Sequence, residues 1–112
     1  MDVVNAMQAD ANIKVKELRV DGGATANNFL MQFQSDLLDT KVIRPKITET
    51  TALGAAYFAG LAVGFWENME AIQSQWQVDR IFESSIDNND RERVAGNWKR
   101  AIGATKFWAD NA

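Results

Sequence analysis

The sequence predicts an α/β fold that is rich in helix and contains about two short parallel strands. Two short runs of strand character are separated by a helical pattern, and the segment after the second run is again helical in its periodicity. Two strands joined through a helix form a βαβ unit, whose crossover is expected to be right-handed. We therefore expect about five helices around a small sheet that is at least partly parallel.

The first helix is predicted over residues 2–11, where apolar side chains recur at helical spacing. Val3, Val4, Met7 and Ala11 form its apolar stripe. No turn or capping residue stands in front of this helix, so the chain is expected to have been cut from something longer.

A strand is predicted over residues 17–20, because Leu18 and Val20 alternate with polar side chains and a Gly-Gly turn follows. The second helix is predicted from Ala26 to about Asp39. Its apolar face consists of Ala26, Phe29, Leu30, Phe33 and Leu37.

A second strand is predicted over residues 41–44. It ends at Pro45, which has no N–H to donate to a sheet ladder. The long helix that follows, within residues 49–66, has four candidate capping residues, namely Thr48, Glu49, Thr50 and Thr51. Small side chains recur every four positions in it, at Ala56, Gly60 and Gly64. We expect this side to pack closely against another backbone in a core.

Three further elements are predicted in the last part of the chain. Residues 67–73 form a short helix, residues 77–82 an extended connector, and residues 87–90 offer caps for a final helix. The stripe of that helix, typical of a core or an interface, consists of Val94, Trp98, Ala101, Thr105 and Trp108. The polar loop 84–90 is interpreted as a solvated turn, with partner docking as the alternative.

Composition excludes several classes of protein. With 112 residues, 46% hydrophobic and 24% charged, the chain is expected to form one small domain that buries somewhat over ~60% of its unfolded surface. The absence of cysteine fits a reducing compartment, and the absence of histidine removes the usual general base. A net charge of -3 argues against nucleic-acid binding. The longest apolar stretch, residues 52–66, is shorter than the ~20 residues of a membrane span.

The turn after the first strand is the strongest candidate for a ligand site. Gly22 and Gly23 let a ligand approach bare backbone, and the next helix directs unpaired N–H groups toward the same space. Asn27, one turn into that helix, has an amide that donates and accepts. The alternative is an ordinary tight connection with Thr25 as helix cap and Asn27 merely exposed. Asp21 is a metal-ligand candidate, although capping the turn is favoured, and the two best-known phosphate fingerprints are absent.

Two segments carry a resemblance to a known family. VDGGATANNFLMQFQSDLL (residues 20–38) and ETTALGAAYFAGLAVGFW (residues 49–66) resemble the C-terminal part of glycerol kinases, within the FGGY carbohydrate kinases of the actin-like ATPase superfamily. The similarity covers essentially the whole chain. The Gly-Gly turn alone indicates only the superfamily, whereas the NNFLMQFQSD block is more specific.

The resemblance implies a ribonuclease H-like fold and a two-domain enzyme that transfers the γ-phosphoryl group of Mg-ATP to glycerol. The Gly-Gly turn matches the family's adenosine motif, on the nucleotide side of the cleft between domains. Gly23 and Asn27 match ATP/ADP-binding positions, and Gly22 and Ala24 support the turn. Thr25 matches a variable position, so it is not counted as a ligand contact.

Glycerol kinases are several times longer than this chain. Their N-terminal domain supplies the glycerol pocket, the aspartate base and most groups that handle Mg²⁺. Residues 1–112 are therefore expected to be a C-terminal part of the second domain, with no catalytic residue and no metal ligand of their own. We expect no kinase activity, very weak nucleotide affinity and self-association through exposed apolar faces. The parent enzyme is expected to be cytoplasmic and homo-oligomeric.

Two alternatives stay open. A kinase for another polyol or sugar would differ mainly in its acceptor pocket, which this chain does not contain. A non-catalytic helical interaction module would use the face that carries Trp98 and Trp108.

Overall fold

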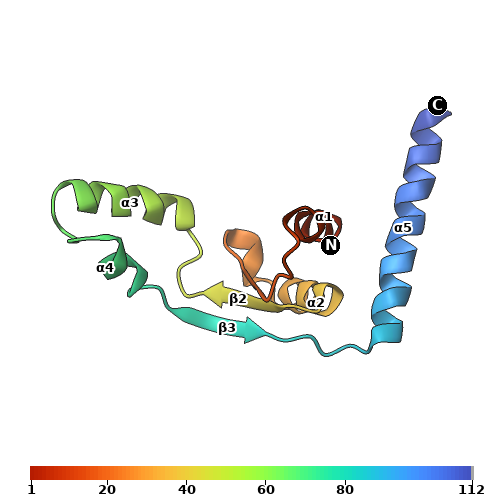
Figure 1. The fold of residues 1–112 in the computed structure, drawn as a ribbon, viewed down its shortest axis with the longest axis horizontal. Coiled ribbons are helices and arrows are strands. Elements are labelled where there is room, and N and C mark those ends of the chain that lie inside the picture. The colour runs from red at the N-terminus through yellow and green to blue at the C-terminus, as the bar shows by residue number, and fades with distance from the viewer. Residues whose placement is uncertain (112) are drawn as a thin grey trace.

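The computed structural model describes residues 1–111, which form five α-helices, one 3-10 helix and three strands (Figure 1). In chain order these elements are α1 (Asp2–Ala11), β1 (Glu17–Arg19), η1 (Gly23–Ala26), α2 (Asn28–Leu38), β2 (Lys41–Pro45), α3 (Thr50–Ala62), α4 (Met69–Gln73), β3 (Val78–Phe82) and α5 (Asn88–Asp110).

The three strands form one mixed sheet in the order β1-β2-β3. β1 pairs parallel to β2, with Leu18 opposite Val42, which confirms the parallel pair expected from the sequence. β3 pairs antiparallel to β2, with Ile81 opposite Ile43. The prediction of a connector over residues 77–82 is therefore wrong. Phe82 is the one buried residue of β3, so the segment lacks the alternating pattern by which strands are recognised.

α2 packs on one face of the sheet and covers the core. Met31 of α2, Val42 of β2 and Phe82 of β3 are the buried residues of this cluster. Partly buried hydrophobic residues pack against them, namely Leu18, Val20 and Leu30. The helix that follows β1 in sequence therefore folds back over the parallel strand pair, as a βαβ unit requires.

Arg91 joins the start of α5 to the end of α2. Its Nε donates to the Asp36 carbonyl at 2.6 Å, and one terminal nitrogen donates to Ser84 Oγ at 2.8 Å and to Asp39 Oδ1 at 3.1 Å. Asp87 caps α5 as expected, since its Oδ1 accepts from the Asp90 N–H at 2.9 Å. α5 is thus anchored at its first turn.

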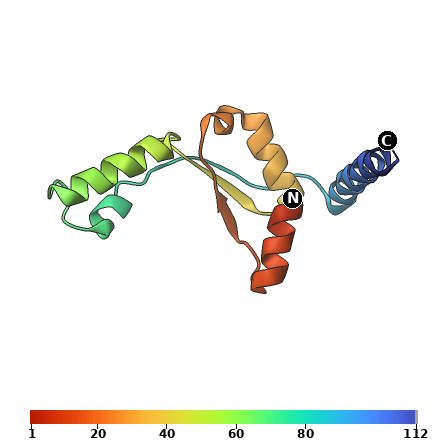
Figure 2. The same ribbon diagram turned by 90° about the horizontal axis from the view of Figure 1, so that it is seen from above.

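The molecule is elongated rather than compact. α3 and α4 extend from one end of the sheet, and α5 stands away from the other end (Figures 1 and 2). The Cα radius of gyration is 18.5 Å, against about 13 Å for a compact domain of this length. The exposed surface is 8434 Å², so the chain buries roughly half of its unfolded surface. The expectation of somewhat over ~60% is wrong, because α3 and α5 add little to the core.

α3 ends earlier and packs differently than the sequence suggests. Gly64 lies beyond the helix at φ 76°, where the Phe65 N–H donates to the Gly60 carbonyl at 2.8 Å. The chain then returns so that the Trp66 ring covers Gly60, and a methyl group there would overlap the ring. Gly60 is therefore covered by a side chain, and not by the second backbone that was expected, while Ala56 is exposed.

The start of α3 lies where the sequence predicts it. Glu49, one of the four candidates, occupies the N-cap position, but no side chain makes a capping hydrogen bond there. The expected short helix after α3 is confirmed as α4, which begins two residues late because Asn68 caps it and accepts from the Ala71 N–H at 2.9 Å.

Most of the apolar stripe of α5 is exposed in this structure, although Val94 is partly buried. Trp98 is 50% exposed and Trp108 76% exposed, and no residue of α5 up to Asp110 is buried. The indole nitrogen of Trp98 donates to Asp2 Oδ2 of α1 at 2.8 Å. In residues 1–111, no helix has the length and hydropathy needed to span a membrane.

Candidate functional site

The Gly-Gly turn begins directly at the end of β1. The Val20 N–H still donates to the Ile43 carbonyl at 3.1 Å, and the backbone then turns at Gly22, which has φ 86° and ψ 165°. Only glycine adopts this conformation without strain. Gly22 is therefore required by the fold of the turn itself.

Both backbone polar groups of Gly22 are used within the protein. Its N–H donates to the Thr48 carbonyl at 2.8 Å, which ties the turn to the start of α3. Its carbonyl accepts from the Thr25 N–H at 3.1 Å and from Thr25 Oγ1 at 2.6 Å. Thr25 is 4% exposed. Its buried hydroxyl stabilises the turn through the bond to the Gly22 carbonyl, and it does not cap α2.

Gly23 and Ala24 are the first two residues of η1. They differ from Gly22 because no residue that the structure describes uses their N–H groups. Both are exposed, and within residues 1–111 neither N–H has a hydrogen-bond partner in the protein. A methyl group added at Gly23 would meet no protein atom within 4 Å, and its φ is not in the left-handed region. Nothing in the described fold requires glycine here, so the space in front of Gly23 is open to a ligand.

Asn27 is the N-cap of α2 and does not lie one turn inside the helix, as the sequence analysis placed it. Its Oδ1 accepts from the Leu30 N–H at 3.1 Å. The predicted start at Ala26 is wrong because the chain first makes the 3-10 turn η1. The Asn27 Nδ2 group donates to no acceptor in the described part of the chain. Asn27 can thus act on a ligand as a donor, while its acceptor oxygen serves the helix.

The four predicted site residues therefore lie in one short turn, but they do not have equal roles. Gly23, Ala24 and Asn27 offer donors that are not used by the protein, whereas Gly22 shapes the backbone. The arrangement suits a ligand rich in hydrogen-bond acceptors.

Arg44 is a polar residue at this site that the sequence analysis did not identify. It lies near the end of β2, its side chain is 13% exposed, and it donates to the Thr25 carbonyl beneath the turn at 2.8 Å. No local pattern marks it, because its role depends on the parallel pairing that brings β2 under the turn.

Asp21 lies on the other side of the turn. Its Oδ2 accepts from the hydroxyl of Thr50, at the first turn of α3. No group of three or more acidic, cysteine or histidine side chains comes together within residues 1–111. The carboxylate of Asp21 serves the connection between the turn and α3, and we assign it no metal.

A charged pair lies at the opposite end of β2 from the turn. Lys41 Nζ and Glu83 Oε1 are 2.8 Å apart, and both side chains are exposed. The hydrogen bond from Lys41 lowers the pKa of Glu83, and the same contact raises the pKa of Lys41. Lys41 is the first residue of β2 and Glu83 directly follows β3, so the pair lies away from the Gly-Gly turn.

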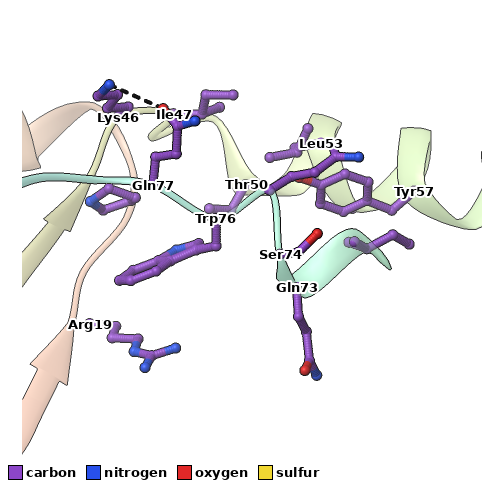
Figure 3. A pocket seen from close by; sticks show the side chains of 14 residues that line it. Arg19, Lys46, Ile47, Thr50, Leu53, Tyr57, Gln73, Ser74, Trp76 and Gln77 are labelled. Atoms are coloured by element: carbon purple, nitrogen blue, oxygen red, sulfur yellow. Dashed lines mark hydrogen bonds between the residues drawn. The ribbon is translucent and has the colours of Figure 1, made fainter. Parts of the chain in front are cut away.

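A groove of about 1080 Å³ lies outside the turn. It lies between the sheet end, α3 and α4, and its walls include Trp76, Tyr57 and Leu53 (Figure 3). Arg19 stacks at 4.4 Å from the centre of the Trp76 ring. Because Leu18 and Val20 face α2, Arg19 and this groove are on the opposite face of the sheet.

The profile of the "FGGY family of carbohydrate kinases, C-terminal domain" matches residues 1–63. Curated relatives named glycerol kinase include those of Burkholderia multivorans, 57% identical over 100% of this chain, and Borreliella afzelii, 59% identical over 99%. The chain spans 22% of the length of each of these relatives.

Solved structures give a similar result. The glycerol kinase of Plasmodium falciparum, solved with ADP, has a TM-score of 0.76 and 36% identity, and covers 92% of this chain and 21% of its own. A ligand-bound xylulose kinase from Lactobacillus acidophilus has a TM-score of 0.65 and covers 83% of this chain and 19% of its own. At 15% identity, the second similarity supports the fold alone. The two similarities confirm the helix-rich α/β fold that the sequence predicts.

Proposed function

The chain belongs to the FGGY family of carbohydrate kinases, and on this premise we propose that it forms the adenine-nucleotide wall of an ATP:glycerol 3-phosphotransferase. The observation that supports this proposal is the pair of unpaired N–H groups at Gly23 and Ala24, with open space in front of them. Residues 1–112 would form a C-terminal part of the nucleotide-side domain.

The proposed contacts follow from which groups the protein leaves unused. The amides of Gly23 and Ala24 and the Nδ2 group of Asn27 donate to acceptors of ATP or ADP. Gly22 makes no direct contact through its N–H, because that donor is engaged by Thr48. The ADP-bound relative from Plasmodium falciparum supports an adenine nucleotide as the ligand.

The reaction that we propose for the whole enzyme is transfer of the γ-phosphoryl group of Mg-ATP to glycerol, which gives sn-glycerol 3-phosphate. The names of the curated relatives support glycerol as the acceptor. Phosphoryl transfer depends on positioning and on charge stabilisation between the attacking and leaving oxygens. The described residues contribute donors for the nucleotide, and they bring together no acidic cluster for Mg²⁺. We therefore derive no step of the transfer from them.

The chain alone is accordingly proposed to lack kinase activity. A coupled assay of the purified 112-residue chain should detect no glycerol-dependent ADP formation. Detection of such turnover would contradict this part of the proposal.

Association through exposed apolar faces is a further part of the proposal, for a homo-oligomeric, cytoplasmic parent. Large apolar side chains are exposed on both α3 and α5, including Phe58 at 74% and Trp108 at 76%. We expect the average mass by light scattering to increase with concentration. A constant monomer mass at high concentration would contradict self-association.

Titration of the ¹⁵N-labelled chain with ADP tests the nucleotide wall. We expect concentration-dependent shifts at the Gly23 and Ala24 amides and at the Asn27 side-chain amide, at millimolar ADP. Shifts confined to the Trp76 indole and its neighbours would place the nucleotide in the groove on the other sheet face and contradict the proposal.

A further inference from the structure

Arg44 places a guanidinium group at the edge of the core, directly beneath the Gly-Gly turn. Side chains alternate along a strand, so Arg44 lies on the same face of β2 as Val42, which is 0% exposed. The Arg44 side chain is itself only 13% exposed. Its guanidinium carbon lies 5.3 Å from the centre of the Phe82 ring.

This one side chain connects three segments of the chain. One terminal nitrogen donates to the Thr25 carbonyl and to Asn28 Oδ1, both at 2.8 Å, and lies 3.5 Å from the Ala26 carbonyl. Its Nε donates to Asp79 Oδ2 of β3 at 2.8 Å. The turn, the start of α2 and the edge strand are therefore held by the same rigid planar group.

The geometry of these contacts favours positioning over simple stabilisation. The carbonyls at the end of a 3-10 helix have no further partner inside the helix. A guanidinium fixes several acceptors in one plane, whereas a lysine ammonium acts as a point charge on a flexible stem. Burying a charge of this kind contributes little to stability compared with an apolar side chain of similar size.

The contact with Arg44 also explains why an asparagine, Asn28, follows Asn27. Asn27 caps α2, while the Asn28 side chain accepts from Arg44. The two residues on either side of the helix start are thereby held in fixed orientations, with Asn27 Nδ2 left as a donor.

We propose that Arg44 is a positioning residue for the nucleotide. Arg44 does not contact the nucleotide. It holds η1 through the Thr25 carbonyl, so that the Gly23 and Ala24 amides keep the orientation that the ligand requires. This inference rests on the proposed nucleotide function of the turn. It assigns a role in ligand affinity to a residue on β2, on the side of the turn away from the exposed amides.

Three variants of the full chain test the proposal. Arg44→Met keeps the apolar stem against Phe82 and removes the guanidinium. Arg44→Lys keeps a positive charge without the planar donor set. Asp79→Asn weakens the ion pair with β3 and leaves the contacts to the turn in place, so it serves as the matched control.

The measurements are the initial slope of the ADP-induced shift at the Ala24 amide and the hydrogen-exchange rate of the Thr25 amide. In Arg44→Met we expect apparent ADP affinity to fall about tenfold and exchange at Thr25 to accelerate by a similar factor. Arg44→Lys should resemble Arg44→Met, and Asp79→Asn should stay within about twofold of the original chain. If Arg44→Met does not fold, Arg44→Lys supports the same comparison.

The outcomes separate the two proposals. Unchanged ADP affinity in a folded Arg44→Met or Arg44→Lys chain overturns the positioning role and leaves the nucleotide wall intact. Full rescue by lysine also overturns it, because charge alone would then suffice. Absence of any ADP-induced shift in the original chain overturns the proposed function, and the inference with it.

Discussion

The central unit of the molecule, formed by the sheet, η1 and α2, differs from the outlying helices α3 and α5 in what surrounds its side chains. In the central unit Met31, Val42 and Phe82 are almost completely buried. No buried side-chain nitrogen or oxygen in residues 1–111 lacks a hydrogen-bond partner. On the outlying helices, Phe58 and Trp108 are about three-quarters exposed.

This difference shows where the shape of the candidate site comes from. The Gly-Gly turn is bounded by contacts within the central unit and by the first residues that lead into α3. Its geometry therefore depends on the start of α3, through Thr48 and Thr50, but not on the exposed remainder of α3 or on α5. We therefore expect substitutions in the central unit and in the outlying helices to act independently on stability.

Replacement of a buried phenylalanine should have the largest effect. Phe82→Ala removes a side chain that is 2% exposed, and we expect a loss of about 3–5 kcal/mol in the free energy of unfolding. Such a loss removes much of the total stability of a small domain. Urea denaturation followed by circular dichroism measures it.

Phe58→Ala in α3 is the matched control for Phe82→Ala. Phe58 is 74% exposed, so its removal should change stability by less than about 0.5 kcal/mol. Equal losses of unfolding free energy in the two variants would show that Phe58 is buried in solution. The contrast between the central unit and α3 would then be wrong.

Gly22→Ala should destabilise the central unit next most strongly. The φ of 86° and ψ of 165° at this residue cost about 1–3 kcal/mol for a residue with a side chain. Gly103→Ala, in the open interior of α5, provides the control and should instead be neutral or stabilising. Equal stability of the Gly22→Ala chain in urea denaturation would show that the turn adopts another backbone conformation.

Arg91→Ala should release α5 without unfolding the central unit. Its charged donors contact the Asp36 carbonyl and the Ser84 hydroxyl, and their loss should cost about 1.5 kcal/mol. Hydrogen exchange should accelerate in the first turns of α5 and stay constant in β2. Arg93→Ala, which removes an exposed pair with Asp90, should leave both rates unchanged. Faster exchange throughout the sheet would contradict the independence of α5.

Glu83→Gln should have the smallest effect, because Lys41 and Glu83 form an exposed pair. The pKa of Glu83 is lowered from 4.5, so its contribution is present above that pH and is lost as pH falls through the lowered value. The pKa of Lys41 is raised from 10.5, so its contribution is present below that pH and is lost as pH rises through the raised value. The variant should therefore match the original chain at acid pH and be slightly less stable near neutrality. A deficit in thermal unfolding as large as that of Arg91→Ala would contradict this ranking.

Local periodicity predicted most of the elements correctly. The bounds of α1 and the parallel pairing of β1 with β2 followed from apolar spacing and from the βαβ rule. β3 was missed because a strand that exposes most of its residues has no alternating pattern. The stripe of α5 was correctly predicted as helical, but spacing alone does not say which surface covers it.

Within the candidate site, the sequence predicted the turn but not the roles of its residues. Two adjacent glycines look equivalent in a sequence. Only the backbone angles and the hydrogen bond to Thr48 separate Gly22, which shapes the turn, from Gly23, which leaves space open. Arg44 and Arg91 act across strand pairing and helix packing, so no local pattern identifies them.

The most direct test of the central claim is ADP titration of the Gly23→Ala chain, followed at the Ala24 amide. A methyl group at Gly23 meets no protein atom within 4 Å, so the fold and its unfolding midpoint should be unchanged. The same methyl group occupies the space proposed for the nucleotide, and the ADP-induced shift of Ala24 should disappear. A Gly23→Ala chain that binds ADP as well as the original sequence would contradict the assignment of this turn as a nucleotide wall.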